Sequence, residues 1–224
     1  MFELYHCIDA RSFRPLWTLE ELGLPYRLNM LGFPPRVLHK SYRGINPLGT
    51  IPLLLDGESR LTESAAICQY LAARHSPRNM NVEADEPGFA DYLNYLHFGE
   101  ATLTFPQTLV LRYRQFEPPE RLQRQVAEDY EKWFLARLRN LDSHLGRRQW
   151  LSSERFTAAD ISVGYALLLA RHLGLGGQMS PVVDAYWQRL ESRPAFLRAQ
   201  QAQQRAAAEQ GIPPIPAPLT GRTG

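Results

Sequence analysis

The chain is poor in cysteine, with only Cys7 and Cys68 among its 224 residues, and these two do not form a CxxC pair. This scarcity excludes a disulfide framework, argues against dithiol redox chemistry and favours the reducing cytoplasm as the location. We expect both thiols to be buried and unreactive. No run of about 18 apolar residues is present, so we expect no membrane-spanning helix and no membrane partner. The first residues already have the pattern of a strand, so we expect no signal peptide.

Neither sign of charge is in excess, since the chain has 25 lysines and arginines and 23 aspartates and glutamates. This balance gives no reason to expect a nucleic-acid partner or an acidic tail. The sequence also contains no internal repeat, no glycine-rich phosphate loop and no group of His, Cys and Asp residues with metal-ligand spacing. We therefore expect no metal site. The length is sufficient for one large core or two small ones.

Residues 1–76 alternate between strand and helix patterns. The expected elements are strands over residues 2–7 and 26–30, a helix over 12–22 that ends at Gly23, a turn and short helix over 34–43, hairpin strands over 51–55 and 59–61, and a helix over 63–75. A strand–helix–strand unit of this length places its two strands in parallel. The order predicts a thioredoxin-like α/β domain over residues 1–76.

The remainder of the chain predicts helices only. A polar segment with proline at both ends, residues 77–87, reads as a linker to an all-helical domain over residues 88–208. The expected helices cover residues 88–113 with a kink or break near Pro106, 119–145, 156–173, 181–192 and 194–208. Residues 156–173 are the most apolar, so this helix is expected at the centre, and Thr157 with Asp160 forms a capping box that gives Asp160 a structural role. The proline-rich tail, residues 209–224, is expected to have little fixed structure.

The most informative stretch joins the hairpin to the helix that follows it. Pro52 precedes the first hairpin strand, a position that suits a residue unable to donate to a sheet. Thr62, Glu63 and Ser64 then begin a helix, and a helix N-terminus offers unpaired N–H groups to a carboxylate. Each feature alone is also ordinary structure, a helix cap or an edge-strand proline. Their order and spacing together favour a ligand site.

This stretch resembles the glutathione site of the cytosolic glutathione transferase superfamily. The likeness extends over nearly the whole chain. The segment ERFTAADISVGY is similar to the corresponding part of the family's helical domain, and WQRLESRPAFLRA is similar to the last helices of bacterial members. It implies that Ile51 presents its backbone to glutathione across a cis bond to Pro52, and that Glu63 and Ser64 hold the γ-glutamyl end. It also implies contacts of the glycine end with Thr50 and with nearby polar residues: His39, Lys40 and Tyr42.

The thiol-activating residue departs from the family patterns. Tyr5 falls where tyrosine-type members have their tyrosine, Asp9 where serine-type members have serine, and Arg11 where cysteine-type members have cysteine. An aspartate aimed at the sulfur would raise the thiol pKa, which is the wrong chemistry for activation. We favour Ser12 as the catalytic residue, placed to cap the first helix and assisted by Arg11, with Tyr5 as the next candidate. Ser12 as a plain cap and Arg11 as a solvated side chain remain the alternatives.

The resemblance further implies a homodimer, glutathione as co-substrate without any other cofactor, and a small hydrophobic electrophile as second substrate. The candidate electrophile contacts lie along the first long helix: His97, Glu100, Thr104 and Gln107. The predicted function is glutathione transfer to that electrophile. Two alternatives remain open, namely another glutathione-dependent enzyme (an isomerase, peroxidase or dehalogenase) and a non-catalytic binding protein with the same fold.

Overall fold

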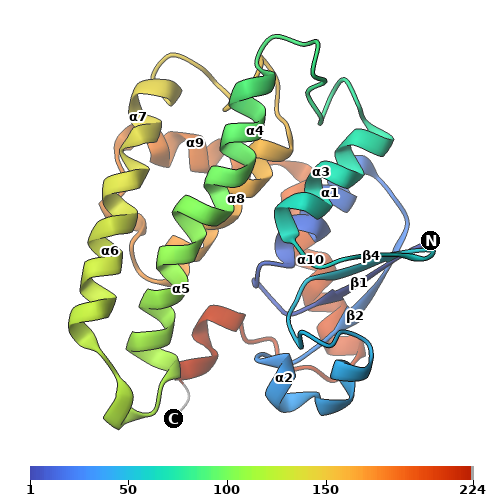
Figure 1. Ribbon diagram of the computed structural model, residues 1–224, viewed down its shortest axis with the longest axis vertical. Helices are drawn as coiled ribbons and strands as arrows, with labels where there is room; N and C mark the ends of the chain where they lie inside the picture. Colours follow the sequence, from blue (N-terminus) through green and yellow to red (C-terminus); the bar gives the residue numbers. More distant parts are fainter. Residues whose placement is uncertain (223–224) are drawn as a thin grey trace.

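A four-stranded sheet in the order β2-β1-β3-β4 forms the N-terminal half of the computed structural model, which describes residues 1–222 (Figure 1). β1 (Phe2–His6) pairs in parallel with β2 (Tyr26–Met30) and antiparallel with β3 (Leu53–Asp56). β4 (Ser59–Leu61) completes the sheet as the hairpin partner of β3. The parallel pair confirms the predicted strand–helix–strand unit, and the whole arrangement is thioredoxin-like, as expected.

Helix α1 (Phe13–Leu22) connects the two parallel strands and contacts α3 (Ser64–His75). α1 ends at Gly23, which adopts φ 62°, a left-handed conformation that glycine accepts without steric cost. The short helix α2 (Pro35–Leu38) and the 3-10 helix η1 (Lys40–Gly44) lie apart from this pair, below the sheet in Figure 1.

All further regular elements of the described chain are helices, joined by loops. They are α4 (Phe89–His97), the π-helix η2 (Phe98–Thr104), α5 (Phe105–Leu111), the π-helix η3 (Arg112–Phe116), the 3-10 turn η4 (Pro119–Arg121), α6 (Arg124–Leu138), α7 (Asn140–Leu145), α8 (Ala158–His172), the 3-10 turn η5 (Gly176–Gln178), α9 (Pro181–Glu191), α10 (Pro194–Glu209) and the 3-10 helix η6 (Ala217–Arg222). The chain does not leave the helical path near Pro106, because α4, η2, α5 and η3 follow one another as a continuous helical run (Figure 1). The regular α-helix is instead interrupted there by the π-helix η2. The π-helical turns of η2 precede Pro106 directly, where the i→i−4 bonding of an α-helix would lack its N–H donor.

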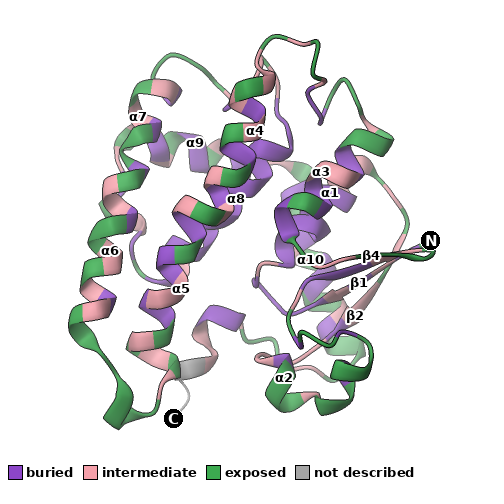
Figure 2. Cartoon of the chain, in the orientation of Figure 1, coloured by how far each residue is buried: buried purple, intermediate pink, exposed green. Residues whose placement is uncertain are grey.

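Helix α8 is the central buried helix that its composition predicts, and every residue from Ala158 to Ala170 is buried (Figure 2). Its predicted capping box is present. The Asp160 carboxylate accepts hydrogen bonds from Thr157 N–H at 2.8 Å, Leu151 N–H at 3.1 Å and Tyr186 O–H at 2.7 Å. These bonds confirm the structural role of Asp160.

The C-terminal segment differs from its expectation. Instead of lacking fixed structure, the tail folds back through η6 onto the loop between β1 and α1. The backbone N–H of Ala217 donates to Ile8 C=O at 2.7 Å, and the Ala217 side chain packs with Cys7 and Ala10. Proline and alanine in a polar setting gave no local signal for this contact, since the partner residues lie about two hundred positions earlier in the chain.

Candidate active site between the two domains

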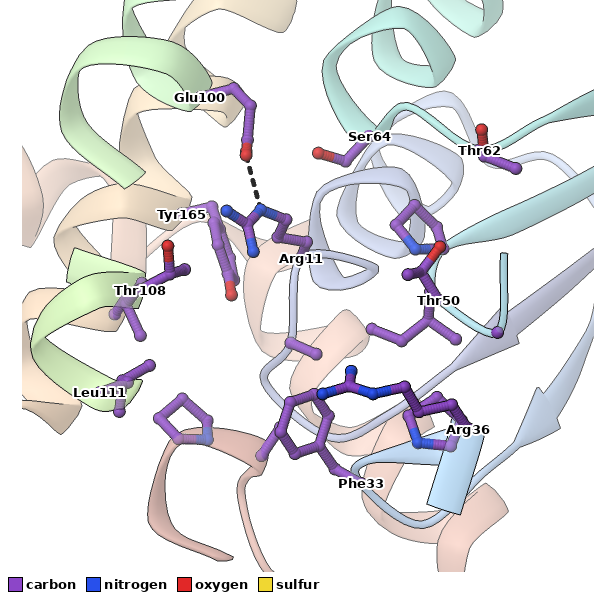
Figure 3. Close-up of a pocket in the computed structure, with 18 of the residues that line it drawn as sticks. Arg11, Phe33, Arg36, Thr50, Thr62, Ser64, Glu100, Thr108, Leu111 and Tyr165 are labelled. Carbon is purple, nitrogen blue, oxygen red and sulfur yellow. Dashed lines mark hydrogen bonds and ion pairs between the residues drawn. The ribbon is translucent and has the colours of Figure 1, made fainter. Parts of the chain in front are cut away.

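A cavity of about 450 Å³ lies where the sheet domain meets the helical domain (Figure 3). Its polar wall comes from the sheet domain: Arg36, Thr50, Ile51, Pro52, Thr62, Glu63 and Ser64. Its apolar wall comes mainly from the helical domain and the tail: Phe33, Leu111, Phe116, Leu169, Ala217 and Pro218. Arg11, Glu100 and Tyr165 lie together at the border between the two walls, and Thr108 lies beside Leu111 on the helical side. The cavity therefore offers a polar ligand site next to an apolar one.

The polar wall brings together the residues that the hairpin stretch predicts. The Ile51–Pro52 bond is cis, as expected. The carbonyl of Thr50 accepts hydrogen bonds from Tyr42 O–H at 2.9 Å and from Asn46 Nδ2 at 2.8 Å, which fixes the turn before the proline. Glu63 occupies the N-cap position of α3 with an extended backbone, and both Glu63 and Ser64 line the cavity, so the first turn of this helix begins at the polar wall.

Arg11 and Arg14 share the carboxylate of Glu100 at the border between the domains. Arg11 Nε donates to Glu100 Oε1 at 2.5 Å, and Arg14 Nη1 donates to Glu100 Oε2. The fully buried Arg14 side chain also donates to oxygen atoms from both domains: Ser64 Oγ at 3.1 Å, Thr104 Oγ1 at 2.7 Å, Gly99 C=O at 3.2 Å and Ser162 C=O at 3.0 Å. Arg14 thus fastens the sheet domain to the helical domain.

The charges of this cluster do not cancel. Burial raises the pKa of Glu100, but the charges of Arg14 and Arg11 outweigh burial and leave that pKa below its usual value. Burial likewise lowers the pKa of Arg11, and the charge of Glu100 reverses this effect and raises it. At neutral pH two guanidinium groups therefore face one carboxylate, and the excess positive charge borders the cavity at Arg11.

The structure places Ser12 and Tyr5 outside the cavity. Ser12 is fully buried, and its hydroxyl exchanges hydrogen bonds with the backbone of Cys7, accepting from N–H at 3.2 Å and donating to C=O at 3.4 Å. The expectation that this hydroxyl caps the first helix is wrong, since α1 has no side-chain cap bond. The Tyr5 ring packs on Tyr42, with 5.4 Å between ring centroids. Of the three predicted catalytic residues, only Arg11 reaches the cavity.

Asp9 also points away from the cavity. Its carboxylate accepts from Gln203 Nε2 at 2.6 Å and Gln200 Nε2 at 3.2 Å, and it pairs with His172 Nε2 at 3.2 Å. Burial raises the pKa of Asp9, but the contacts with His172 and Gln203 outweigh burial and keep the pKa below its usual value. The backbone at Asp9 has φ 50°, which turns the carboxylate toward α8 and α10. Its negative charge is therefore directed away from any bound thiol.

Of the predicted glycine-end contacts, only Thr50 lines the cavity, and the other three lie outside its lining. His39 Nε2 accepts from Gly32 N–H at 2.8 Å, Tyr42 is buried with its hydroxyl on Thr50, and neither residue lines the cavity. Lys40 is exposed and also outside the lining. Arg36 is the cationic side chain on this side of the cavity. Sequence reasoning missed it because an arginine beside two prolines has no distinctive pattern.

Only Glu100 among the four predicted electrophile contacts borders the cavity. His97 lines a separate surface hollow beside Phe98. Thr104 and Gln107 are fully buried: Thr104 accepts from Arg14, and Gln107 Nε2 donates to Leu103 C=O at 2.9 Å and Ala166 C=O at 3.0 Å. The helical run therefore turns Thr104 and Gln107 toward the core, and the cavity receives Thr108 and Leu111 in addition to Glu100.

Both cysteines are buried, as expected. Burial raises the pKa of the Cys68 thiol to about 11 and raises the pKa of Cys7 further still. Both thiols are therefore protonated at neutral pH, and neither is the reactive form.

Comparisons with known proteins agree with this architecture. Residues 10–74 match the family described as Glutathione S-transferase, N-terminal domain. Glutathione S-transferase GstB of Escherichia coli (strain K12) is 30% identical over 183 residues, which are 80% of this chain and 88% of that protein. Glutathione S-transferase 3 of Schizosaccharomyces pombe is 27% identical over 205 residues, which are 87% of this chain and 85% of that protein. The crystal structure of the glutathione transferase URE2P5 from Phanerochaete chrysosporium has a TM-score of 0.80 at 26% identity, covering 94% of this chain and 97% of that one.

The chain belongs to the glutathione S-transferase family. It is a transferase with a thioredoxin-like N-terminal domain and with glutathione as its co-substrate, as the resemblance implied. No helix within residues 1–222 is long and apolar enough to cross a membrane. Over the same residues, no group of three or more His, Cys, Asp or Glu side chains is arranged to hold a metal ion.

Proposed function

We propose that this transferase joins glutathione to small hydrophobic electrophiles and that Arg11 stabilises the glutathione thiolate. The excess positive charge of the Arg11, Arg14 and Glu100 cluster is the observation that supports this most directly. A positive charge beside a thiol favours the thiolate, which is the nucleophile. Glu100 holds the Arg11 guanidinium in place, so the charge is already positioned before the substrate binds.

Glutathione is a tripeptide with charged ends, and the polar wall has a partner for each part. The backbone of Ile51 pairs with the cysteinyl peptide unit, as an added strand would. The helix start at Ser64 receives the γ-glutamyl carboxylate, and the carboxylate of Glu63 receives the ammonium group. The guanidinium of Arg36, with Thr50 beside it, is placed for the glycyl carboxylate across the cavity.

The apolar wall suits the second substrate. Phe33 from the sheet domain and Phe116 from η3 contact one another with 5.6 Å between ring centroids, so that both domains contribute to this wall. Small-molecule sites are typically apolar with a few fixed polar groups, which is the composition here. In the reaction the thiol proton goes to solvent, a sulfur lone pair forms the S–C bond, and the leaving group departs with its bonding electrons.

The orientation of Asp9 argues against a non-catalytic role. Asp9 stands where serine-type members have serine, and a negative charge there would destabilise a thiolate. A carboxylate facing the cavity would therefore favour a binding protein without activity. Since the carboxylate instead pairs with His172 and Gln203, the cavity does not contain that charge.

The test is the ultraviolet absorbance of bound glutathione thiolate as a function of pH, for the unaltered protein and for Arg11→Gln. We expect the bound thiol pKa to lie well below about 8.5, the usual value of a free thiol, and Arg11→Gln to restore it toward that value. Arg198→Gln is the control, because Arg198 is exposed and pairs with Glu20 far from the cavity. An unchanged thiol pKa in Arg11→Gln would exclude Arg11 as the activating group, and absence of glutathione binding to the unaltered protein would exclude the transferase mechanism.

We also propose that the protein is a cytoplasmic homodimer. Large apolar side chains that remain exposed in the single chain, such as Leu48 and Phe105, support an interface with a second copy. Light scattering after size exclusion tests this proposal, and a monomer mass at all concentrations would contradict it.

A further inference from the structure

The hydroxyl group of Tyr165 reaches the cavity from the helical domain. Tyr165 lies on α8 and borders the cavity beside Arg11, with its hydroxyl end pointing away from Glu100 (Figure 3). The hydroxyl donates to the backbone C=O of Asp9 at 3.4 Å. Asp9 directly precedes Ala10 and Arg11, so the hydroxyl lies at the loop where the thiol activator of this enzyme is expected.

The hydrogen bond to Asp9 leaves this hydroxyl available to a better acceptor. O–H···O bonds are usually about 2.7–2.8 Å long, so a donor–acceptor distance of 3.4 Å is a weak contact. A thiolate is a charged acceptor, and hydrogen bonds to charged groups are about twice as strong as those between neutral groups. A thiolate bound in the cavity therefore replaces the Asp9 carbonyl at little cost.

The Tyr165 ring is held before any ligand binds. The guanidinium carbon of Arg14 lies 4.4 Å from the ring centroid, a cation–π contact. Arg14 is itself fully buried and bonded to both domains. With the ring fixed in this way, only the O–H bond has to turn from the Asp9 carbonyl to the sulfur when glutathione binds, so little reorganisation is left for the reaction itself.

The hydroxyl also keeps its proton at neutral pH. Burial raises the pKa of Tyr165, and the charges of Arg11 and Arg14 oppose this effect without overcoming it. A neutral phenol donates a hydrogen bond, whereas a phenolate would repel a thiolate. A hydrogen bond to the ionised form of a group lowers its pKa.

We infer that Tyr165 is a catalytic residue that donates a hydrogen bond to the glutathione thiolate from the helical domain, beside Arg11. It takes the place of the hydroxyl groups of Tyr5 and Ser12, which the fold turns away from the cavity. The inference rests on the proposed transferase function. The O–H bond of Tyr165 stays intact throughout, because the thiol proton leaves to solvent before the sulfur attacks.

Tyr165→Phe tests this inference, since it removes the hydroxyl and keeps the ring over Arg14. We expect the pKa of bound glutathione to rise by about one unit, which is a tenfold loss of thiolate at a pH below both pKa values, with a smaller fall in turnover at neutral pH, where part of the thiol is already ionised. Tyr92→Phe is the matched control: Tyr92 is equally buried on α4, its hydroxyl has no hydrogen-bond partner among the described residues, and it lies outside the cavity lining. Urea unfolding of both variants checks that the fold is retained.

The outcomes separate the inference from the function on which it rests. A lowered thiol pKa in the unaltered protein that rises in Tyr165→Phe and not in Tyr92→Phe supports the inference. A thiol pKa that is equally low in Tyr165→Phe overturns it, even if turnover falls, because the hydroxyl would then act on the electrophile. A thiol pKa that is not lowered in the unaltered protein overturns the proposed function itself.

Discussion

The fully buried Arg14 makes a prediction about how the two domains are held together. Replacing Arg14 with leucine removes one of the two charge partners of Glu100. It also removes the hydrogen-bond donor that Arg14 provides to three oxygen atoms: Gly99 C=O, Thr104 Oγ1 and Ser64 Oγ. Removing one partner of a buried ion pair costs about 3–5 kcal/mol. Arg11 still pairs with Glu100, so we expect the lower end, about 3 kcal/mol of unfolding free energy.

The measurement is urea unfolding followed by tryptophan fluorescence, because Trp17 and Trp187 are both buried. The slope with denaturant should be unchanged, so that a lower midpoint reports stability. Arg198→Leu is the control: this arginine is 51% exposed and pairs with Glu20, and exposed pairs contribute about 0–1 kcal/mol.

A double variant tests the electrostatic part of the reasoning. Adding Glu100→Gln to Arg14→Leu removes the underpaired carboxylate, so we expect the double variant to be more stable than the sum of the two single effects by about 1–2 kcal/mol. The reasoning is refuted if Arg14→Leu costs no more than Arg198→Leu, or if the two single effects simply add.

Three further predictions concern other parts of the site. Glu63→Ala should weaken glutathione binding without changing the unfolding midpoint, whereas lost stability with unchanged affinity in calorimetry would make Glu63 a structural cap only. Deleting residues 213–224 removes Ala217 and Pro218 from the apolar wall, so affinity for S-hexylglutathione should fall about tenfold while affinity for S-methylglutathione stays constant; equal losses for both ligands would contradict this. The folded-state pKa of Asp9 is lowered, so its carboxylate stabilises the fold above the unfolded pKa of about 3.9 and this stabilisation is lost as pH falls further. The stability difference between the unaltered protein and Asp9→Asn should therefore shrink below about pH 4, and a pH-independent difference in urea unfolding would exclude this account.

The sequence by itself determined the features that depend on neighbouring residues. The strand at Tyr26–Met30, the hairpin around Asp56 and Gly57, the helix end at Gly23 and the capping box of Thr157 and Asp160 lie where the patterns place them. Turn chemistry, capping and periodicity act within a few positions, so a single sequence contains the required information. The residues predicted to contact glutathione from Thr50 to Pro52 and from Glu63 to Ser64 line one cavity for the same reason, since one hairpin and one helix start position them.

The tertiary structure alone decided which side chains of the candidate activating loop point into the cavity. Asp9 lies where serine-type members have serine, but its carboxylate turns toward His172 on α8 and Gln203 on α10. The hydroxyl of Ser12 is taken up by the backbone of Cys7. Arg11 pairs with Glu100, which is 89 positions later in the chain. Tyr165 lines the cavity from the middle of an apolar helix, whose composition predicts only a core position. The direction of a side chain at a domain border depends on contacts far apart in sequence, and no local pattern specifies those contacts.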